Sequence, residues 1–118
     1  MSKVRKVTKA EFGRFQKVFC FYQLLLGVPE YEVYFEQTDI DAIAQIDRNV
    51  KGCVAVVKLN TRIPTEDAND GWVEETAKHE AIHLFLNRLM YLAKSRWSAE
   101  GEIDREEERI TRILERII

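Results

Sequence analysis

The chain has 118 residues, of which 46% are hydrophobic and 32% charged, and its formal net charge is −2. This length suits one domain with a single core. The balanced composition excludes a disordered chain and a broadly basic nucleic-acid binder. We therefore expect one domain over residues 1–118.

Charge is unevenly distributed along the sequence. Residues 1–20 carry six Lys or Arg and one acid, whereas residues 30–47 carry six acids and no base. We interpret both segments mainly as solvated faces, and residues 1–7 as a flexible basic tail. Binding of nucleic acid through this basic arm is the less favoured interpretation.

A helix is predicted from Thr8 to about Leu26. Thr8 and Glu11 have the spacing of a capping box, which marks the start of a helix. Gly27 and Pro29 mark its end. The residues that should face the core recur at helical spacing, and they are Phe12, Phe15, Phe19, Tyr22 and Leu26.

Strands are expected in the next part of the chain. Residues 31–36 are rich in aromatic and β-branched side chains, and residues 53–59 are the clearest strand. Residues 39–47 fit either a helix or a short second strand. A turn over 49–52 and a polar loop over 61–69 should connect these elements.

Two cysteines, Cys20 and Cys53, both have apolar neighbours and belong to no C-x-x-C pair. We expect buried free thiols in a reducing compartment and assign neither to a metal. Residues 18–28 are apolar but too short to cross a membrane. The sequence thus predicts a soluble cytoplasmic protein without a membrane partner.

Residues 71–94 are predicted to form one long helix with Asp70 as its N-cap. From Ala81 to Ala93 the helix is apolar nearly all round, which is typical of a helix at the centre of a domain. Asn87 lies four residues after His83 and shares its face. We interpret it as a satisfied polar residue, with a supporting role beside His83 as the alternative.

The pentapeptide His79-Glu80-Ala81-Ile82-His83 contains both histidines of the chain. Residues four apart on a helix lie one above the other, so the two imidazoles can share one metal ion. Glu80 lies about 100° around the helix from His79, where it can act on a metal-bound water without being a ligand. This H-E-x-x-H pattern is that of zinc metallopeptidases, with Glu80 as general base. Two core histidines without a metal are the less favoured interpretation.

A catalytic zinc ion needs a third protein ligand, and a carboxylate is the natural choice because no third histidine exists. The last predicted helix runs from Ala99 to the C-terminus, with Ser98 as its cap. Its apolar stripe consists of Ile103, Ile110, Leu114 and Ile117. Glu106 and Glu107 both border this stripe, and spacing does not separate them. The elements together predict an α+β fold with an N-terminal helix, a sheet of two to three strands, the motif helix and a C-terminal helix.

The stretch from Lys78 to Glu115 resembles a family of small zinc metallopeptidases carried mainly by bacteriophages and prophages. Besides the motif, the resemblance rests on Ser98, on residues 100–103 and on Glu107-Glu108-Arg109, Arg112 and Glu115. It implies a zincin-like fold close to a minimal gluzincin, with one Zn²⁺ per chain. It also implies that Glu107 is the third ligand, with Glu108 as an exposed neighbour. Glu106 stays the alternate, because helix spacing alone does not separate it from Glu107. Gly101 departs from the family pattern in the first turn of the last helix.

The expected function is therefore hydrolysis of peptide bonds in a protein or peptide substrate, with His79, His83 and Glu107 as zinc ligands and Glu80 as the catalytic base. The alternative is a zinc-binding structural or interaction module without turnover, for instance a phage accessory protein. The sequence carries no indication of an oligomeric state.

Overall fold

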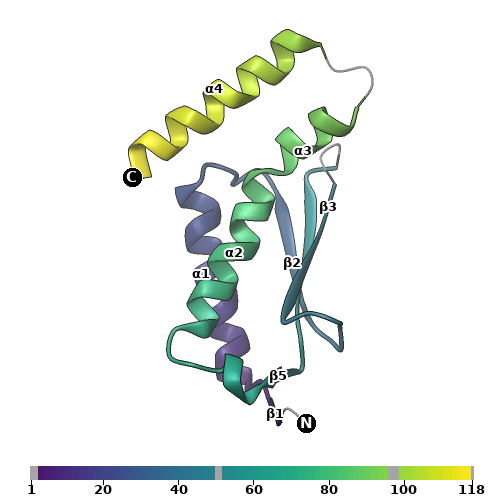
Figure 1. The fold of residues 1–118 in the computed structure, drawn as a ribbon, viewed down its shortest axis with the longest axis vertical. Coiled ribbons are helices and arrows are strands. Elements are labelled where there is room, and N and C mark those ends of the chain that lie inside the picture. The colour runs from purple at the N-terminus through teal and green to yellow at the C-terminus, as the bar shows by residue number, and fades with distance from the viewer. Residues whose placement is uncertain (1–2, 50–51, 96–98, 118) are drawn as a thin grey trace.

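The computed structural model describes residues 3–49, 52–95 and 99–117, which form an α+β fold (Figure 1). This confirms the predicted class. In chain order the elements are β1 (Val4–Lys6), α1 (Lys9–Leu25), β2 (Glu32–Gln37), β3 (Ala44–Asn49), β4 (Val54–Leu59), β5 (Arg62–Pro64), the 3-10 turn η1 (Thr65–Asp67), α2 (Trp72–Phe85), α3 (Asn87–Lys94) and α4 (Glu100–Ile117).

Val4–Lys6 form a strand where a flexible tail was expected over residues 1–7, of which residues 1 and 2 lie outside the described residues. β1 pairs antiparallel with β5, and Val4 lies opposite Pro64. The predicted polar loop over residues 61–69 is likewise wrong, because it contains β5 and η1. Each strand is three residues long, which is too short to show the alternating pattern of a strand in the sequence. The two strands also depend on each other for their hydrogen bonds.

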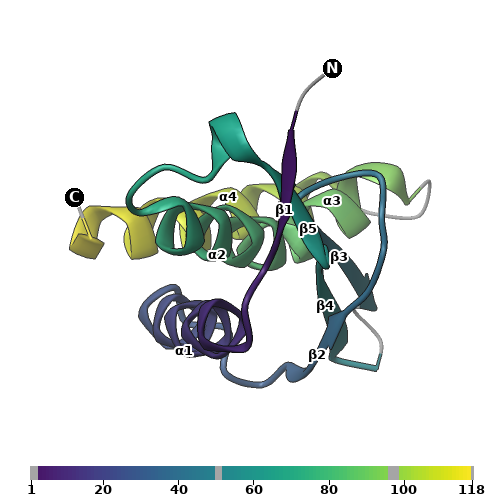
Figure 2. The ribbon, with the colours of Figure 1, turned by 90° about the horizontal axis from the view of Figure 1, so that it is seen from below.

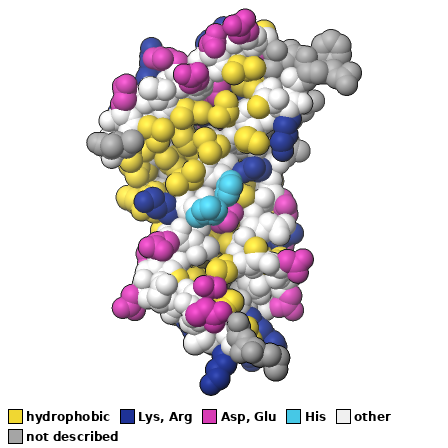
Figure 3. All heavy atoms as spheres, in the orientation of Figure 1, with side chains coloured by type: hydrophobic (Ala, Val, Ile, Leu, Met, Phe, Trp, Pro, Cys, Tyr) yellow, Lys and Arg dark blue, Asp and Glu magenta, His cyan; other side chains and the backbone are white. Residues whose placement is uncertain are grey.

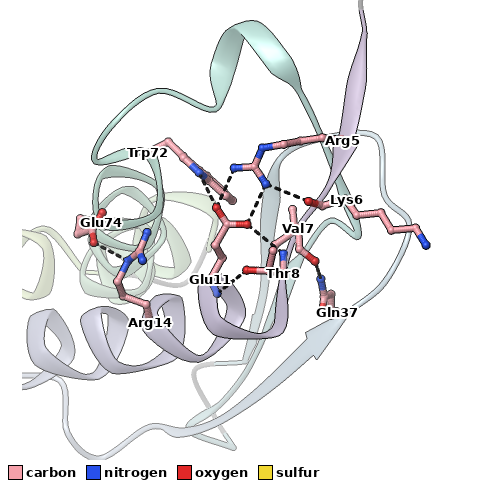
Figure 4. A network of polar contacts seen from close by, with 9 residues as sticks. All are labelled: Arg5, Lys6, Val7, Thr8, Glu11, Arg14, Gln37, Trp72 and Glu74. Carbon is pink, nitrogen blue, oxygen red and sulfur yellow. Dashed lines mark hydrogen bonds and ion pairs between the residues drawn. The ribbon is translucent and has the colours of Figure 1, made fainter.

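Glu11 joins the N-terminal strand to the first two helices (Figure 4). Its carboxylate accepts two hydrogen bonds from the Arg5 guanidinium, at 2.9 and 2.8 Å, and one from the Trp72 indole at 3.2 Å. Glu11 and Thr8 also form the predicted capping box at the start of α1. These contacts hold the pKa of Glu11 at about 2, chiefly because the Arg5 side chain stabilises the charged form.

Helix α1 buries the predicted aromatic stripe. Phe15 and Phe19 are fully buried, and Phe12 and Tyr22 pack partly buried against the same core. Figure 2 shows α1 and α2 side by side on one face of the sheet. The opposing sheet residues come from β4, whose alternate side chains Ala55, Val57 and Leu59 point into the core.

The larger sheet has the order β2-β4-β3, with β2 parallel and β3 antiparallel to β4. The ambiguous segment around residues 39–47 therefore contributes a strand, β3, and β3 is an edge of this sheet. Strand β4, predicted as residues 53–59, lies in the middle. The predicted turn over 49–52 lies partly outside the described residues.

The long helix predicted over residues 71–94 is divided at Leu86 into α2 and α3. Its N-cap is Gly71, not Asp70, and Gly71 has φ +82°, a left-handed conformation that favours glycine. The expectation of burial all round is also wrong, because Ile82, Met90 and Tyr91 are exposed.

Helix α4 crosses one end of the molecule and packs mainly against α3 (Figure 1). Its buried residues are Glu106 and Ile113, whereas Ile103, Leu114 and Ile117 of the predicted stripe are exposed. Part of the apolar face of α4 therefore meets solvent. The predicted cap Ser98 lies outside the described residues.

Two further expectations concern the cysteines and membranes. Both cysteines are free, but Cys20 is exposed and Cys53 is half-buried, so the prediction that both are buried is wrong. Within residues 3–49, 52–95 and 99–117, no helix is both long and apolar enough to cross a membrane.

Candidate metal centre

The two motif histidines lie on the exposed face of α2, one turn apart. Their Nε2 atoms are 3.2 Å apart and their rings meet edge to face, with centroids separated by 4.7 Å. Two nitrogen ligands at 2.0–2.1 Å from a tetrahedral zinc ion are about 3.3 Å apart. The separation in the structure therefore fits two ligands of one zinc ion. Figure 3 shows both imidazoles together at the surface, next to a broad apolar area.

Glu80 of α2 is only 6% exposed and lines the space between α2 and β3. Burial raises the pKa of its carboxyl above the usual value, and the nearby charges of His79 and Arg48 oppose this shift in part. A raised pKa brings the protonated form closer to neutral pH. Glu80 is therefore suited to accept a proton and give it back, as a general base must.

Partial desolvation of the ring lowers the pKa of His83, and the charges of His79 and Arg48 act in the same direction. A lowered pKa favours the neutral imidazole, which is the form that binds a metal. Both imidazoles remain accessible to an ion from solvent, because His79 and His83 are exposed residues.

The edge strand β3 forms the other wall of the site. Two shallow, adjoining cavities of about 360 and 300 Å³ run between α2 and β3. Ala44, His79 and Glu80 line both cavities, and the second is also lined by Arg48 and His83. The motif side chains thus border an open groove beside a strand edge.

Arg48 is a residue of this site that the sequence analysis missed. Its Nη1 atom donates a hydrogen bond of 2.7 Å to the main-chain oxygen of His83. The chain separates the two residues widely, and only the packing of β3 against α2 brings them together. No motif in the sequence marks Arg48, since its role depends on which strand becomes the edge.

The two candidates for a third ligand lie on α4. Glu107 is exposed, and its main-chain oxygen accepts a hydrogen bond from the Thr111 hydroxyl. Glu106 is buried, and its carboxylate pairs with Arg88 at 3.1 Å and with Arg109 at 2.6 Å. In the described part of the chain, no group of three or more His, Cys, Asp or Glu residues is gathered so as to hold a metal. The structure therefore brings together His79, His83 and Glu80, but neither glutamate of α4 joins them.

Asn87 takes part in the core and not in the site. Its Nδ2 atom donates a hydrogen bond of 2.8 Å to the Tyr31 hydroxyl, and both residues are buried. This agrees with the interpretation of Asn87 as a satisfied polar residue.

A larger cavity of about 530 Å³ lies on the side of α2 and α3 that faces α4. Its charged lining includes Glu106, which pairs with both Arg88 and Arg109. Neither histidine borders it. The chemistry that the motif indicates therefore belongs to the smaller groove at β3.

No protein-family model, no curated protein and no solved structure matches this chain. Its function is therefore inferred from its own residues and their arrangement.

Proposed function

We propose that the protein is a zinc-dependent peptidase that hydrolyses peptide bonds at the groove between α2 and β3. The observation that carries this proposal is the pair of Nε2 atoms 3.2 Å apart with the buried carboxyl of Glu80 beside them. A metal site without turnover needs no buried base next to its ligands. Glu80 therefore favours an enzyme.

His79 and His83 would hold the zinc ion as neutral imidazoles, with Glu107 as the proposed third ligand and Glu106 as the alternate. Bound zinc supplies a Lewis acid that polarises the substrate carbonyl and lowers the pKa of water at an open position to about 7. Glu80 takes a proton from the attacking water and delivers it to the amine that leaves.

The edge strand β3 favours a substrate in extended conformation. Within the described residues, β3 pairs with β4 alone, so its outer edge has main-chain groups available for a peptide. A peptide could add to the valine-rich strand β4 in the same way only if β4 were an edge of the sheet. Strand β4 is bonded on both sides, and β3 takes the role instead.

The first test is the zinc content of the purified protein, measured by elemental mass spectrometry. We expect about one zinc per chain, and loss of zinc in His79→Ala. Glu107→Ala, Glu106→Ala and Glu108→Ala should be measured in parallel, with Glu108 as the control because it pairs with Arg112 on the exposed face of α4. Loss of zinc in one glutamate variant would identify the third ligand.

The second test separates an enzyme from a module that only binds zinc. A structural zinc site is closed by four protein ligands, and among the described residues no such group gathers around the histidines. Hydrolysis of a quenched-fluorescence peptide library is compared between the wild type and Glu80→Gln, both loaded with zinc. Cleavage by the wild type alone supports the peptidase. Zinc binding without cleavage supports the structural module, and absence of zinc binding after reconstitution at neutral pH refutes both.

A further inference from the structure

Arg48 reaches the histidine pair from the sheet side of the groove. Its Nη1 atom is 2.7 Å from the main-chain oxygen of His83, and its side chain lines the same cavity as His79 and Glu80. Antiparallel pairing with β4, in which Arg48 lies opposite Ala55, holds its main chain in place. A cation is thus fixed at the border of the candidate metal centre.

The carboxyl of Glu80 lies near Arg48 in the same cavity but forms no direct ion pair with it. In the part of the chain that the structure describes, no Asp or Glu lies within ion-pair distance of its guanidinium. The adjacent Asp47 pairs with Lys58 instead, at 3.0 Å. A guanidinium has five N–H donors, and the hydrogen bond to His83 takes one of them. Arg48 therefore brings charge and donor capacity to the groove.

A purely structural role would be to satisfy a carbonyl in the last turn of α2. Cations are favourable at that end of a helix, and an unpaired carbonyl there needs a donor. That role requires only the contact with the main chain. It uses one N–H donor, and the guanidinium has four others while its side chain lines the cavity beside the two imidazoles and Glu80.

We propose that Arg48 is a catalytic residue, whose guanidinium donates a hydrogen bond to the carbonyl oxygen of the scissile peptide bond as negative charge develops on that oxygen. This inference rests on the proposed peptidase function. Preorganised donors aimed at such an oxygen are among the strongest contributions to catalysis. A donor anchored to an edge strand and to α2 is held in place before the reaction begins.

The bond changes are those of ordinary amide hydrolysis. The water oxygen bonds to the carbonyl carbon, the π electron pair moves to the carbonyl oxygen, and Glu80 holds the proton that the water loses. Arg48 keeps its own proton throughout, because a guanidinium is not deprotonated in proteins. The C–N bond then breaks, its electron pair leaves with the nitrogen, and Glu80 protonates the amine.

The test compares Arg48→Met, Arg48→Gln and Arg48→Lys with the zinc-loaded wild type on the best peptide of the library. We expect kcat to fall about 100- to 1000-fold in Arg48→Met, with KM changed less than about 3-fold. Arg48→Lys keeps the charge and should recover part of kcat. Arg62→Met is the matched control, because it removes an exposed cation from β5 and should leave kcat unchanged.

Two further measurements separate catalysis from structure. Zinc content and melting temperature should be unchanged in the Arg48 variants. The affinity for a phosphinic analogue of the best peptide, which carries a tetrahedral anionic centre, should fall in proportion to kcat/KM. If Arg48→Met does not fold, Arg48→Gln and Arg48→Lys provide the same comparison.

Each contrary result has a distinct meaning. Wild-type kcat in Arg48→Met, or a change in KM alone, would refute the role of Arg48 at the oxyanion. If every Arg48 variant lost zinc or had a lower melting temperature, this would show that Arg48 only positions His83. A wild type that binds zinc without cleaving any peptide would refute the proposed function itself, and would be evident before any variant is compared.

Discussion

Arg88 on α3 and Glu106 on α4 form an ion pair with an Nε–Oε2 distance of 3.1 Å, and Arg109 holds the other carboxylate oxygen at 2.6 Å. Glu106 is 3% exposed. Arg109 also lies over the ring of Phe85 on α2, 5.5 Å from its centroid. The carboxylate of Glu106 is thus a polar junction between α4 and the helix pair α2–α3.

We predict that the double variant Arg88→Ala with Arg109→Ala lowers the free energy of unfolding by about 3 kcal/mol or more. The reason is that a buried carboxylate loses both cations that compensate for its desolvation. Chemical denaturation measures the loss. Hydrogen exchange should show that peptides of α4 exchange before those of α1.

The control for this prediction is Arg112→Ala, in the exposed pair between Arg112 and Glu108. Their side chains are 74% and 61% exposed, so the change should stay within about 0.5 kcal/mol. A double variant as stable as this control would contradict the assignment of Glu106 as the junction that holds α4.

Local signals in the sequence predict the elements that local interactions determine. Thr8 and Glu11 cap α1 as expected, and the valine-rich segment forms β4. The histidine pair was also predictable from local signals, because the spacing of His79 and His83 on any regular helix brings their rings together.

Features that depend on distant partners were not predictable from these patterns. The strand β1 exists because Val4 meets Pro64, and Arg48 enters the site because β3 packs on α2. Which side of α4 faces the rest of the protein is a further case. Spacing on the helix left Glu106 and Glu107 equivalent, whereas the packing of α4 on α3 buries Glu106 and exposes Glu107.

The buried hydrogen bond from Asn87 to the Tyr31 hydroxyl gives a second prediction. Tyr31→Phe should lower the free energy of unfolding by about 1–3 kcal/mol, because the Asn87 amide is left buried without its acceptor. The matched control is Tyr34→Phe, since Tyr34 is exposed and its hydroxyl bonds the exposed Glu32. Equal effects in thermal denaturation of the two variants would contradict the importance of the buried bond.

Two glycines should respond to alanine with opposite signs. Gly27 follows the C-cap of α1 with φ +74°, which an L side chain rarely adopts, so Gly27→Ala should destabilise the fold by about 1 kcal/mol. Gly13 lies within α1, and an added methyl group there meets nothing within 4 Å. Gly13→Ala should stabilise the fold by about 0.5–1 kcal/mol through higher helix propensity. Urea titrations of the two variants measure both changes, and a common sign would contradict the argument.

The pKa of Glu11, about 2 in the folded chain, predicts how stability depends on acidity. A carboxyl whose pKa is lower in the folded than in the unfolded state stabilises the fold at a pH above the unfolded value, about 4.5. This stabilisation decreases as the pH falls from about 4.5 towards 2. Because the Arg5 side chain is partly exposed, we expect about 1–2 kcal/mol at neutral pH, less than the full shift implies.

The variant that isolates this charge is Glu11→Gln, which can still accept hydrogen bonds and form the capping box with Thr8. At pH 7 it should be about 1–2 kcal/mol less stable than the wild type, and the difference should shrink steadily below pH 4.5. Urea denaturation at several pH values measures the two curves. Parallel curves from pH 7 to pH 2.5 would show that the ion pair with Arg5 does not contribute through charge. Arg5→Gln removes the main cause of the low pKa of Glu11. If the ion pair acts as a unit, the stability of Arg5→Gln should depend on pH as that of Glu11→Gln does.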